Sequence, residues 1–503
     1  MDLRLRQCLA VMTLVVLTAG PSAAGAQQKA TAAPTLQDKL TEWYRRAARA
    51  VPGDWGVAVA DQSGQFLWGV NATKPLIPAS TAKVFTTGFA RTVLGGSARQ
   101  STRVLGTGYA DAEGNWMGTW ALEVNGDPTL ERPSRSGPML RDLAAQLAER
   151  GIRRLTGPLI IQSAAGSADA SYPTAWAPKH RGRRFAPLIG AVTLNENLIS
   201  FTIAPGPRPG TSPRVVASTP DGMSRLVDIS ARTVTGRSDR LRISVLTDGR
   251  YRVTGSIGTG RRGRTYSGTA ANPRLVLEAA WGAALDRAGI EWVQATSLSE
   301  PGQTTGGQTL AEVVSAPLDS IAQEVNTRSL NIGAEALLGW AGGWSGEAAR
   351  KLTEHVREVI GDESAVTLVD GSGLSYEDRA TPMAFVTYLA RFPATPAGRN
   401  FPLLLPANGS GTLRRLANGL PAPGVVRAKT GTLGNAATLV GYLGQKDGML
   451  LVSVMYNGPR VAAAKQQQWR LFRVLGADGS VIPGDDQAEA EPDVMGGETV
   501  PPE

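Results

Sequence analysis

Histidine and cysteine are almost absent from this chain of 503 residues, which contains two histidines and one cysteine. Zinc sites take three or four ligands largely from these two residue types, so the counts exclude a clustered His/Cys metal site. The lone cysteine, Cys8, excludes an intramolecular disulfide. A serine mechanism that depends on an imidazole has only His180 and His355 to draw on.

Membrane-spanning character is also absent, since 42% of the residues are apolar and 19% are charged, as in an ordinary globular protein. Arg4 and Arg6 precede an apolar run over residues 9–19, which ends in small residues at 21–26. This pattern predicts a secretory signal peptide over residues 1–26 and an exported protein, periplasmic or facing the cell wall. The run has about half of the ~20 residues that a spanning helix needs, and an uncleaved anchor is the alternative.

Acidic residues are scarce outside the C-terminus, and the formal net charge is +9. Residues 478–503 hold eight acids, four prolines, four glycines and no basic residue, which predicts a disordered acidic tail. Without the net +1 of residues 1–26 and the net −8 of this tail, the body of the chain carries +16. In an exported protein this charge favours contact with an anionic wall or membrane surface over a nucleic-acid partner.

The hydrophobic pattern divides the rest of the chain into a segment with the spacing of short strands and two flanking parts with mainly helical spacing. Residues 99–291 show short alternating runs broken by Gly, Pro and Asp, and we interpret them as an inserted, mostly β segment. The flanking parts, 27–98 and 292–477, combine helical spacing with a few apolar strands, and together they predict one α/β domain that the insertion interrupts. The expected helices of the flanking parts cover 36–50, 80–95, 318–325, 332–340, 347–360 and 462–475, and the expected strands cover 55–60, 65–70, 425–428, 437–443 and 449–456.

With histidine scarce, lysine is the residue that can activate a serine, if its pKa is lowered from ~10.4. Ser80 and Lys83 stand three residues apart at the start of an expected helix, so both project from one face. The helix N-terminus favours anionic character at Ser80. Alone, this spacing is more typical of a capping serine followed by a surface lysine.

Two further motifs favour a catalytic role for Ser80 and Lys83 over a capping serine with a surface lysine. Ser329 and Asn331 form a Ser-x-Asn pattern between two expected helices, and Lys429-Thr430-Gly431 lies in an expected strand. Taken alone, the Ser-x-Asn pattern also fits an N-cap serine with a turn asparagine, and the Lys-Thr-Gly pattern also fits a lysine that protects a strand edge. Each of the three patterns occurs once in the chain, and their order is that of penicillin-binding proteins and β-lactamases.

On these motifs the chain resembles the penicillin-binding serine D-alanyl-D-alanine carboxypeptidases/endopeptidases, specifically the class C low-molecular-mass penicillin-binding proteins. Ser80 and Ser329 are 249 residues apart, far more than is typical of a class A β-lactamase, and the resembled family carries inserted domains at this place. The resemblance spans about residues 36–475 and implies a β-lactamase/transpeptidase-like fold, an antiparallel sheet flanked by helices. The stretches that support it are 78–83, 125–130, 329–331, 370–375 and 428–433.

The resemblance implies a catalytic role for five residues. Ser80 would be the acylated nucleophile and Lys83 its general base. Ser329 would relay a proton to the leaving amine, and Asn331 would hydrogen-bond the substrate amide. Lys429 would supply positive charge to the pocket and help to lower the pKa of Lys83.

The same resemblance implies a substrate-binding strand. Thr430, Gly431 and Thr432 would bind the terminal carboxylate with Lys429, and the Thr432 backbone N–H would complete an oxyanion hole with that of the nucleophile. Asp127 would lie near the side chain of a peptidoglycan peptide, with a simple turn before Pro128 as the alternative. Tyr376 stands where similar enzymes often have arginine.

The implied activity is that of a serine D-Ala-D-Ala carboxypeptidase/endopeptidase, which cleaves peptidoglycan stem peptides through an acyl-enzyme and is inhibited by β-lactam antibiotics. Neither a metal nor an organic cofactor is implied. The alternatives are a β-lactamase or esterase on the same scaffold and a non-catalytic peptidoglycan-binding protein. The basic cluster at 179–184 is interpreted as a solvated loop, with contact to an anionic polymer or lipid as its alternative.

Overall fold

The computed structural model describes residues 34–132, 137–164, 169–293 and 307–482. The expected signal peptide and most of the expected acidic tail lie outside these ranges. Within them, no helix combines the length and the apolar character needed to cross a membrane. The first helix, α1, covers Leu36–Ala50 as the sequence predicts, and Thr35 caps it because its hydroxyl accepts from the Asp38 N–H.

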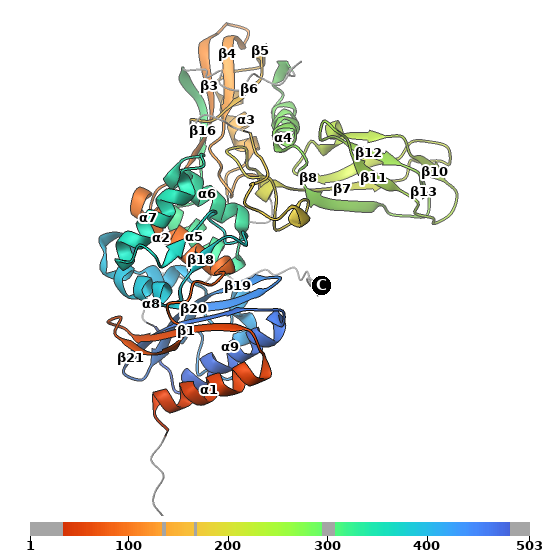
Figure 1. Cartoon of the computed structure of the whole chain (residues 1–503). Helices are drawn as coiled ribbons and strands as arrows, with labels where there is room; N and C mark the ends of the chain where they lie inside the picture. Colours follow the sequence, from red (N-terminus) through yellow and green to blue (C-terminus); the bar gives the residue numbers. More distant parts are fainter. Residues whose placement is uncertain (1–33, 133–136, 165–168, 294–306, 483–503) are drawn as a thin grey trace, which may run out of the picture.

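A five-stranded antiparallel sheet contains strands from both the N-terminal and the C-terminal part of the described chain (Figure 1). Its order is β19-β20-β21-β1-β2, so the N-terminal hairpin pairs with the last strand of the chain. The strands are β1 (Asp54–Asp61), β2 (Phe66–Val70), β19 (Val426–Leu433), β20 (Ala436–Gln445) and β21 (Gly448–Asn457). The central strands are buried on both faces, as expected for a sheet that helices cover on each side.

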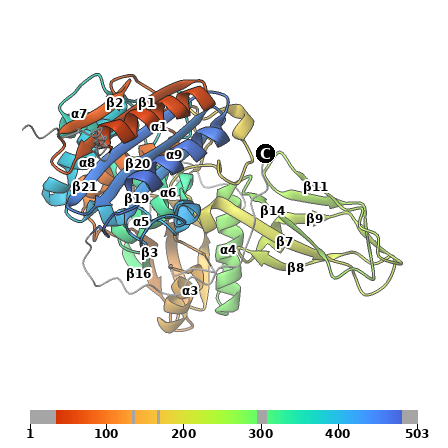
Figure 2. The ribbon, with the colours of Figure 1, turned by 90° about the horizontal axis from the view of Figure 1, so that it is seen from below.

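Alternate side chains of this sheet enter two different cores. Val57 and Val59 pack with α1 and with α9 (Val461–Leu475) on the outer face, which Figure 2 shows from below. Ala58 and Ala60 face the opposite core, which contains the remaining helices of this domain. These helices are α2 (Lys83–Leu94), α5 (Leu318–Arg328), α6 (Asn331–Gly342), α7 (Ala348–Ile360) and α8 (Pro382–Arg391), and a two-stranded ribbon of β17 (Val366–Thr367) and β18 (Arg379–Ala380) lies beside them.

The inserted segment builds a second sheet around β3 and β4. The strand order is β15-β5-β4-β3-β16, with β6 beside β4. The strands are β3 (Ser101–Ala110), β4 (Asn115–Glu123), β5 (Arg154–Pro158), β6 (Ile160–Gln162), β15 (Glu291–Val293) and β16 (Gln308–Val314), and the helices α3 (Leu140–Glu149) and α4 (Pro273–Arg287) share their core. Because β16 pairs with β3, residues 308–314 belong to this sheet, and the boundary expected at residue 291 falls inside it.

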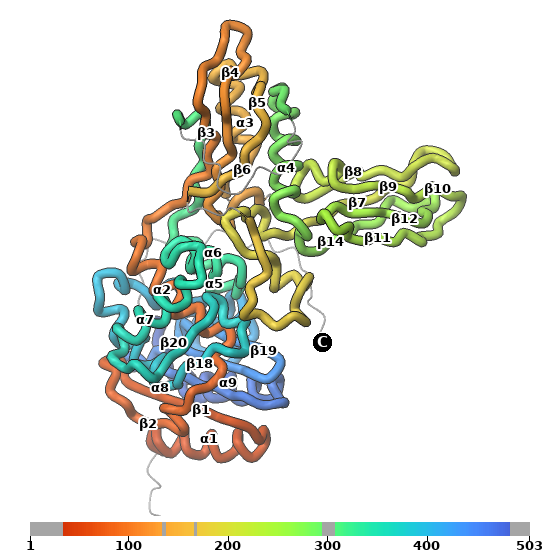
Figure 3. Tube along the Cα trace, turned by 45° about the horizontal axis from the view of Figure 1, so that its top comes forward, coloured from red at the N-terminus to blue at the C-terminus, as the bar shows by residue number. Residues whose placement is uncertain are grey.

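Short strands between residues 198 and 269 form a lobe that extends away from the rest of the molecule (Figures 1 and 3). Two three-stranded sheets, β14-β7-β8 and β11-β12-β9, and the pair β10-β13 make up this lobe. Their bounds are β7 (Leu198–Ala204), β8 (Arg214–Thr219), β9 (Val227–Ile229), β10 (Arg232–Val234), β11 (Arg242–Val245), β12 (Tyr251–Thr254), β13 (Ser256–Gly258) and β14 (Arg264–Thr269). The expected fold class, an α/β domain with an antiparallel sheet and a large, mostly β insertion, is confirmed.

Candidate active site

Ser80 lies in a tight turn that leads into α2. Residues 79–82 form a 3-10 turn, and the α-helix begins at Lys83. Lys83 is fully buried, and its Nζ lies 3.0 Å from Ser80 Oγ. The spacing of three residues therefore brings the two groups into hydrogen-bond contact, as the sequence predicts, although a 3-10 turn precedes the helix.

The Lys83 side chain connects three separate segments of the chain. Besides Ser80, its Nζ donates to Asn331 Oδ1 at 2.7 Å and to the Ser372 carbonyl at 2.6 Å. Burial lowers the pKa of Lys83 from 10.5 to about 8, while the carboxylates of Asp370 and Glu335 act in the opposite direction. A lysine in this range can exchange a proton with a serine hydroxyl near neutral pH.

The Ser-x-Asn motif lies between two helices. Ser329 ends α5 in the left-handed region (φ 59°), so it is a C-terminal cap and not the N-cap of its bland alternative. Lys429 Nζ donates to Ser329 Oγ at 2.9 Å, and Asn331, the first residue of α6, reaches Lys83. The three sequence motifs therefore meet at one point.

Lys429 supplies a second buried amine, on strand β19. Its Nζ also donates to the Thr430 carbonyl at 2.8 Å. Burial lowers the pKa of Lys429 well below its usual value, and the positive charge of Lys83 lowers it further. Two neighbouring amines in a dry site disfavour each other's protonation, which suits a site that must hold one of them neutral.

Gly431 lets β19 lie against the serine turn. A Cβ atom at this position would overlap the Thr438 hydroxyl and would lie 2.8 Å from the Pro78 carbonyl and 3.0 Å from the Ser80 nitrogen. Thr438 also donates to the Pro78 carbonyl at 2.7 Å, which connects β20 to the same turn. Only glycine allows this close approach of the strand and the Ser80 turn.

Three buried carboxyl groups surround the lysine, and none of them was among the predicted site residues. Asp370 accepts hydrogen bonds from three backbone N–H groups of residues 372–375. Glu335 accepts from the Gly371 N–H, and burial raises its pKa to about 8. Burial also raises the pKa of Asp378 well above its usual value. Glu335 stands four residues after Asn331 on α6, a spacing that signals a shared face, whereas no signal in the sequence marks Asp378.

A loop of the insertion contacts the same site. Trp176 Nε1 donates to Asp370 Oδ2 at 3.0 Å, and Asn331 Nδ2 donates to the Phe185 carbonyl at 2.7 Å. Lys179 Nζ lies 5.0 Å from the centre of the Tyr376 ring, so the basic cluster lies beside the candidate site. Neither Trp176 nor Phe185 carries a sequence signal for this position, since both act across the interface of two distant segments.

Asp127 has the geometry of a local turn. Its side chain is 2% exposed, and Oδ1 accepts from the backbone N–H and the hydroxyl of Thr129 at 2.7 and 2.6 Å. Burial raises the pKa of Asp127 to about 6. These contacts match the turn interpretation, and the described hydrogen bonds of Asp127 do not include the Ser80 cluster.

The arrangement can perform acyl transfer. A serine hydroxyl touches a lysine of lowered pKa, and a second serine touches a second lysine on the adjacent strand. Over the residues that the structure describes, no group of three or more His, Cys, Asp or Glu side chains could hold a metal ion. The sheet, the helices and the paired Ser/Lys contacts together are those of a serine hydrolase of the penicillin-recognising class.

Comparison with known proteins specifies that class. The model of the D-Ala-D-Ala carboxypeptidase 3 (S13) family matches residues 45–474, and the chain belongs to this family. A D-alanyl-D-alanine carboxypeptidase of Actinomadura sp. (strain R39) is 28% identical over 434 residues, which cover 80% of this chain and 77% of that protein. A carboxypeptidase of Mycobacterium tuberculosis is 29% identical over 409 residues, with 77% and 72% covered.

Solved structures agree on the fold. Penicillin binding protein 4 from Haemophilus influenzae superposes with a TM-score of 0.67 at 22% identity, covering 86% of this chain and 98% of that one. The sequence resemblance to this group is confirmed, and the chain is a serine-type D-Ala-D-Ala carboxypeptidase.

The close approach at Gly431 generates a test. Gly431→Ala should displace β19 or the Ser80 turn by a fraction of an ångström or more and lower kcat/KM for a D-Ala-D-Ala peptide by about 100-fold. Gly434→Ala is the matched control, because its Cβ would meet only the end of the Tyr376 side chain, at 3.2 Å. Equal activities of the two variants, with folding verified by circular dichroism, would contradict the packing argument.

Proposed function

We propose that the enzyme removes the terminal D-Ala of peptidoglycan stem peptides through an acyl-enzyme formed on Ser80. The observation that carries the proposal is the 3.0 Å contact between Ser80 Oγ and the buried Lys83 Nζ, whose pKa is about 8. Family membership supports the choice of the D-Ala-D-Ala bond.

Acylation begins with neutral Lys83. Its amine takes the Ser80 hydroxyl proton while Oγ attacks the carbonyl carbon of the penultimate D-Ala, and the backbone N–H groups of Ser80 and Thr432 stabilise the developing oxyanion. Ser329 then relays this proton from Lys83 to the nitrogen of the leaving D-Ala, the C–N bond breaks, and Lys83 is neutral again. The hydrogen bond from Lys429 Nζ to Ser329 Oγ supports this role, since it orients the hydroxyl that carries the proton.

Substrate binding is assigned to β19 and to Asn331. Lys429, Thr430 and Thr432 would hold the terminal carboxylate, and Gly431 would leave room for the substrate backbone along the strand edge. Asn331 Nδ2, which donates to the Phe185 carbonyl in the structure, would donate to the carbonyl of the substrate amide. Water then attacks the ester carbonyl, Lys83 accepts its proton, and the amine returns that proton to Ser80 Oγ as the ester bond breaks.

Labelling with a fluorescent penicillin tests the nucleophile. The wild-type protein should incorporate one label per chain, and Ser80→Ala should incorporate none, because the label is an ester of that hydroxyl. Ser97→Ala, a surface substitution, is the control and should label fully. An unlabelled, folded wild type would overturn the proposal and favour a non-catalytic peptidoglycan-binding protein, and rapid loss of the label would favour a β-lactamase.

The pKa of Lys83 predicts the pH dependence. Because burial lowers this pKa, the reactive neutral amine dominates above about pH 8. Below that pH, the acylation rate should fall by up to about tenfold for each pH unit.

Glu335→Gln should move the midpoint of this profile to lower pH, since the Glu335 carboxylate raises the pKa of Lys83. Lys83→Arg should lose at least about 100-fold at every pH, because guanidinium stays protonated. A flat profile from pH 6 to 9 would exclude Lys83 as the base.

Export to an anionic surface is the second part of the proposal. The pattern of residues 1–26 supports export, and the arginine-rich lobe supports contact with anionic lipid or wall polymer. Residues 198–269 contain twelve arginines and four aspartates, with no lysine or glutamate, for a net charge of +8. Arg232, Arg240 and Arg242 line a cavity of about 660 Å³ there, and none of the three takes part in the ion pairs found among the described residues.

Vesicle sedimentation tests this contact. The protein should bind phosphatidylcholine vesicles only when they contain phosphatidylglycerol, and binding should weaken with salt. Replacing Arg232, Arg240 and Arg242 by serine should reduce binding by about tenfold or more, since each basic residue near an anionic surface contributes ~1 kcal/mol. The control replaces Arg45, Arg46 and Arg49 of α1, an equal change in charge. Equal loss in both variants would show that net charge alone, and not the lobe, directs binding.

A further inference from the structure

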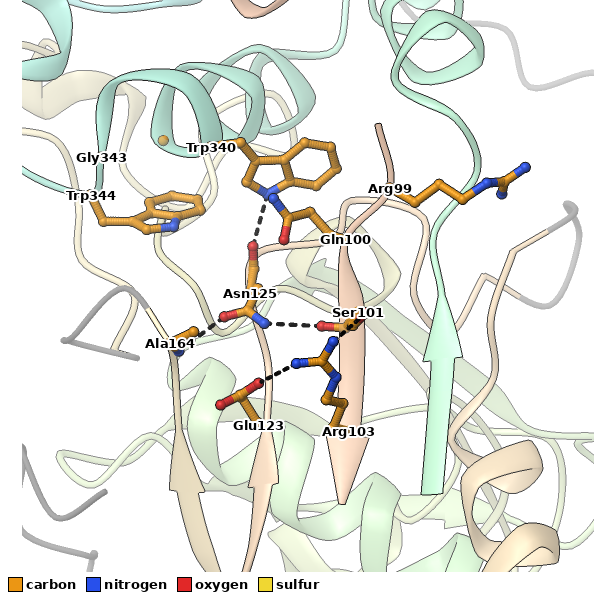
Figure 4. A pocket seen from close by; sticks show the side chains of 11 residues that line it. Arg99, Gln100, Ser101, Arg103, Glu123, Asn125, Ala164, Trp340, Gly343 and Trp344 are labelled. Atoms are coloured by element: carbon orange, nitrogen blue, oxygen red, sulfur yellow. Dashed lines mark hydrogen bonds and ion pairs between the residues drawn. The ribbon is translucent and has the colours of Figure 1, made fainter. Parts of the chain in front are cut away.

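A cavity of about 400 Å³ lies at the end of α6 that is remote from Asn331 (Figure 4). Two tryptophans, Trp340 and Trp344, lie on one side of it, and Glu123 and Arg103 of the second sheet lie on the other. The cavity therefore lies between the catalytic domain and the insertion. Its remaining lining residues are Arg99, Gln100, Ser101, Asn125, Ala164, Gly339 and Gly343.

Asn125 holds the cavity in shape. Its carbonyl accepts from Trp340 Nε1 at 2.8 Å, its Nδ2 donates to the Ser101 carbonyl at 3.0 Å, and its Oδ1 accepts from the Ala164 N–H at 3.1 Å. Figure 4 draws these bonds across the floor of the site. Because the polar groups of Asn125 already have partners, this residue fixes the walls of the cavity, and binding of a ligand depends on the other lining residues.

Two glycines seat the Trp344 indole. A Cβ at Gly339 would lie 2.7 Å from the indole ring, and a Cβ at Gly126 would overlap it. Both indoles are only partly buried, so each keeps part of its surface open. A flat, negatively polarised ring face that is held in place binds the C–H face of a pyranose sugar, because those hydrogens carry partial positive charge.

Glu123 offers a carboxylate oxygen that accepts no hydrogen bond in the described structure and has only a long ion pair with Arg103. The residue is 6% exposed, yet its Oε1 has no hydrogen-bond partner and lies 3.8 Å from Arg103, while Oε2 accepts from Gln162 Nε2 at 3.3 Å. A buried acceptor without a donor is unfavourable, so a ligand that brings a hydroxyl or amide N–H would be stabilised here. Arg103 donates to Glu312 at 2.8 Å and to Ser101 at 3.3 Å, and the remaining N–H groups of its guanidinium are available to a sugar oxygen.

We propose that this cavity binds an amino-sugar unit of a glycan strand. The class follows from the pairing of indole faces with a carboxylate acceptor and a guanidinium donor, which suits the C–H face, the hydroxyls and the N-acetyl group of such a sugar. Its assignment to the glycan of the cell wall rests on the proposed function. Trp340 is nine residues from Asn331, about 14 Å along α6, and four extended peptide residues span about the same length.

Titration calorimetry with the β-1,4-linked tetrasaccharide of N-acetylglucosamine tests the inference. The wild-type protein should bind this sugar. Glu123→Gln and Trp344→Ala should each weaken binding by about tenfold or more, because they remove the anionic acceptor and the ring face. Trp469→Ala, a partly buried tryptophan on α9, is the control and should bind as the wild type does.

Two further arms separate the possible outcomes. No binding by wild type, or equal binding by Glu123→Gln, Trp344→Ala and wild type, would overturn the inference. A sugar-free stem tripeptide that binds in the wild type and loses affinity in both variants would assign the cavity to peptide instead. Penicillin labelling of Ser80 should be unchanged in both variants, so a protein that binds sugar but does not label would sink the proposed function and leave the sugar site standing.

Discussion

The burial of one lysine amine is the constraint on which the rest of this structure depends. Lys83 Nζ is removed from water and satisfied by three oxygens, from Ser80, Asn331 and Ser372. These come from the turn before α2, the start of α6 and the loop that follows β17, so helices far apart in sequence must converge at one point. The same burial lowers the pKa of the amine to about 8, so the group that connects these segments also has the pKa that the proposed base requires.

Holding this amine in a dry site requires compensation from its surroundings. Glu335, Asp370 and Asp378 lie close enough to stabilise its positive charge, while burial raises the pKa of two of them, Glu335 and Asp378. Asp370 also orders the loop at 372–375 and binds Trp176 of the insertion. The inserted segment is thus part of the active site's support, because its Trp176 and Phe185 contact the residues that position the lysine.

The sequence predicts the helices and strands around the site well, because regular elements carry their period in the chain. The helix at 36–50, the helices on either side of Ser329 and the late strands all appear within a few residues of their expected bounds. The strand at 308–314 was not expected, because its pairing with β3 depends on residues two hundred positions away. The three site motifs were found because each is short and local, whereas Asp378 and Trp176 act through contacts that no spacing in the sequence indicates.

By itself, the sequence determined the chemical class of this protein, since scarce histidine and cysteine leave lysine as the activator and the three ordered motifs supply it. It also indicated the family, through the order of the three motifs, and the interruption of the α/β domain, through the order of helices and strands along the chain. Only the tertiary structure decided the electrostatics of the site and its neighbours: how deeply Lys83 is buried, which carboxyl groups offset its charge, and which loop of the insertion meets Asn331. The physical reason is that desolvation and Coulomb energies depend on distances through space, which residue order alone does not specify.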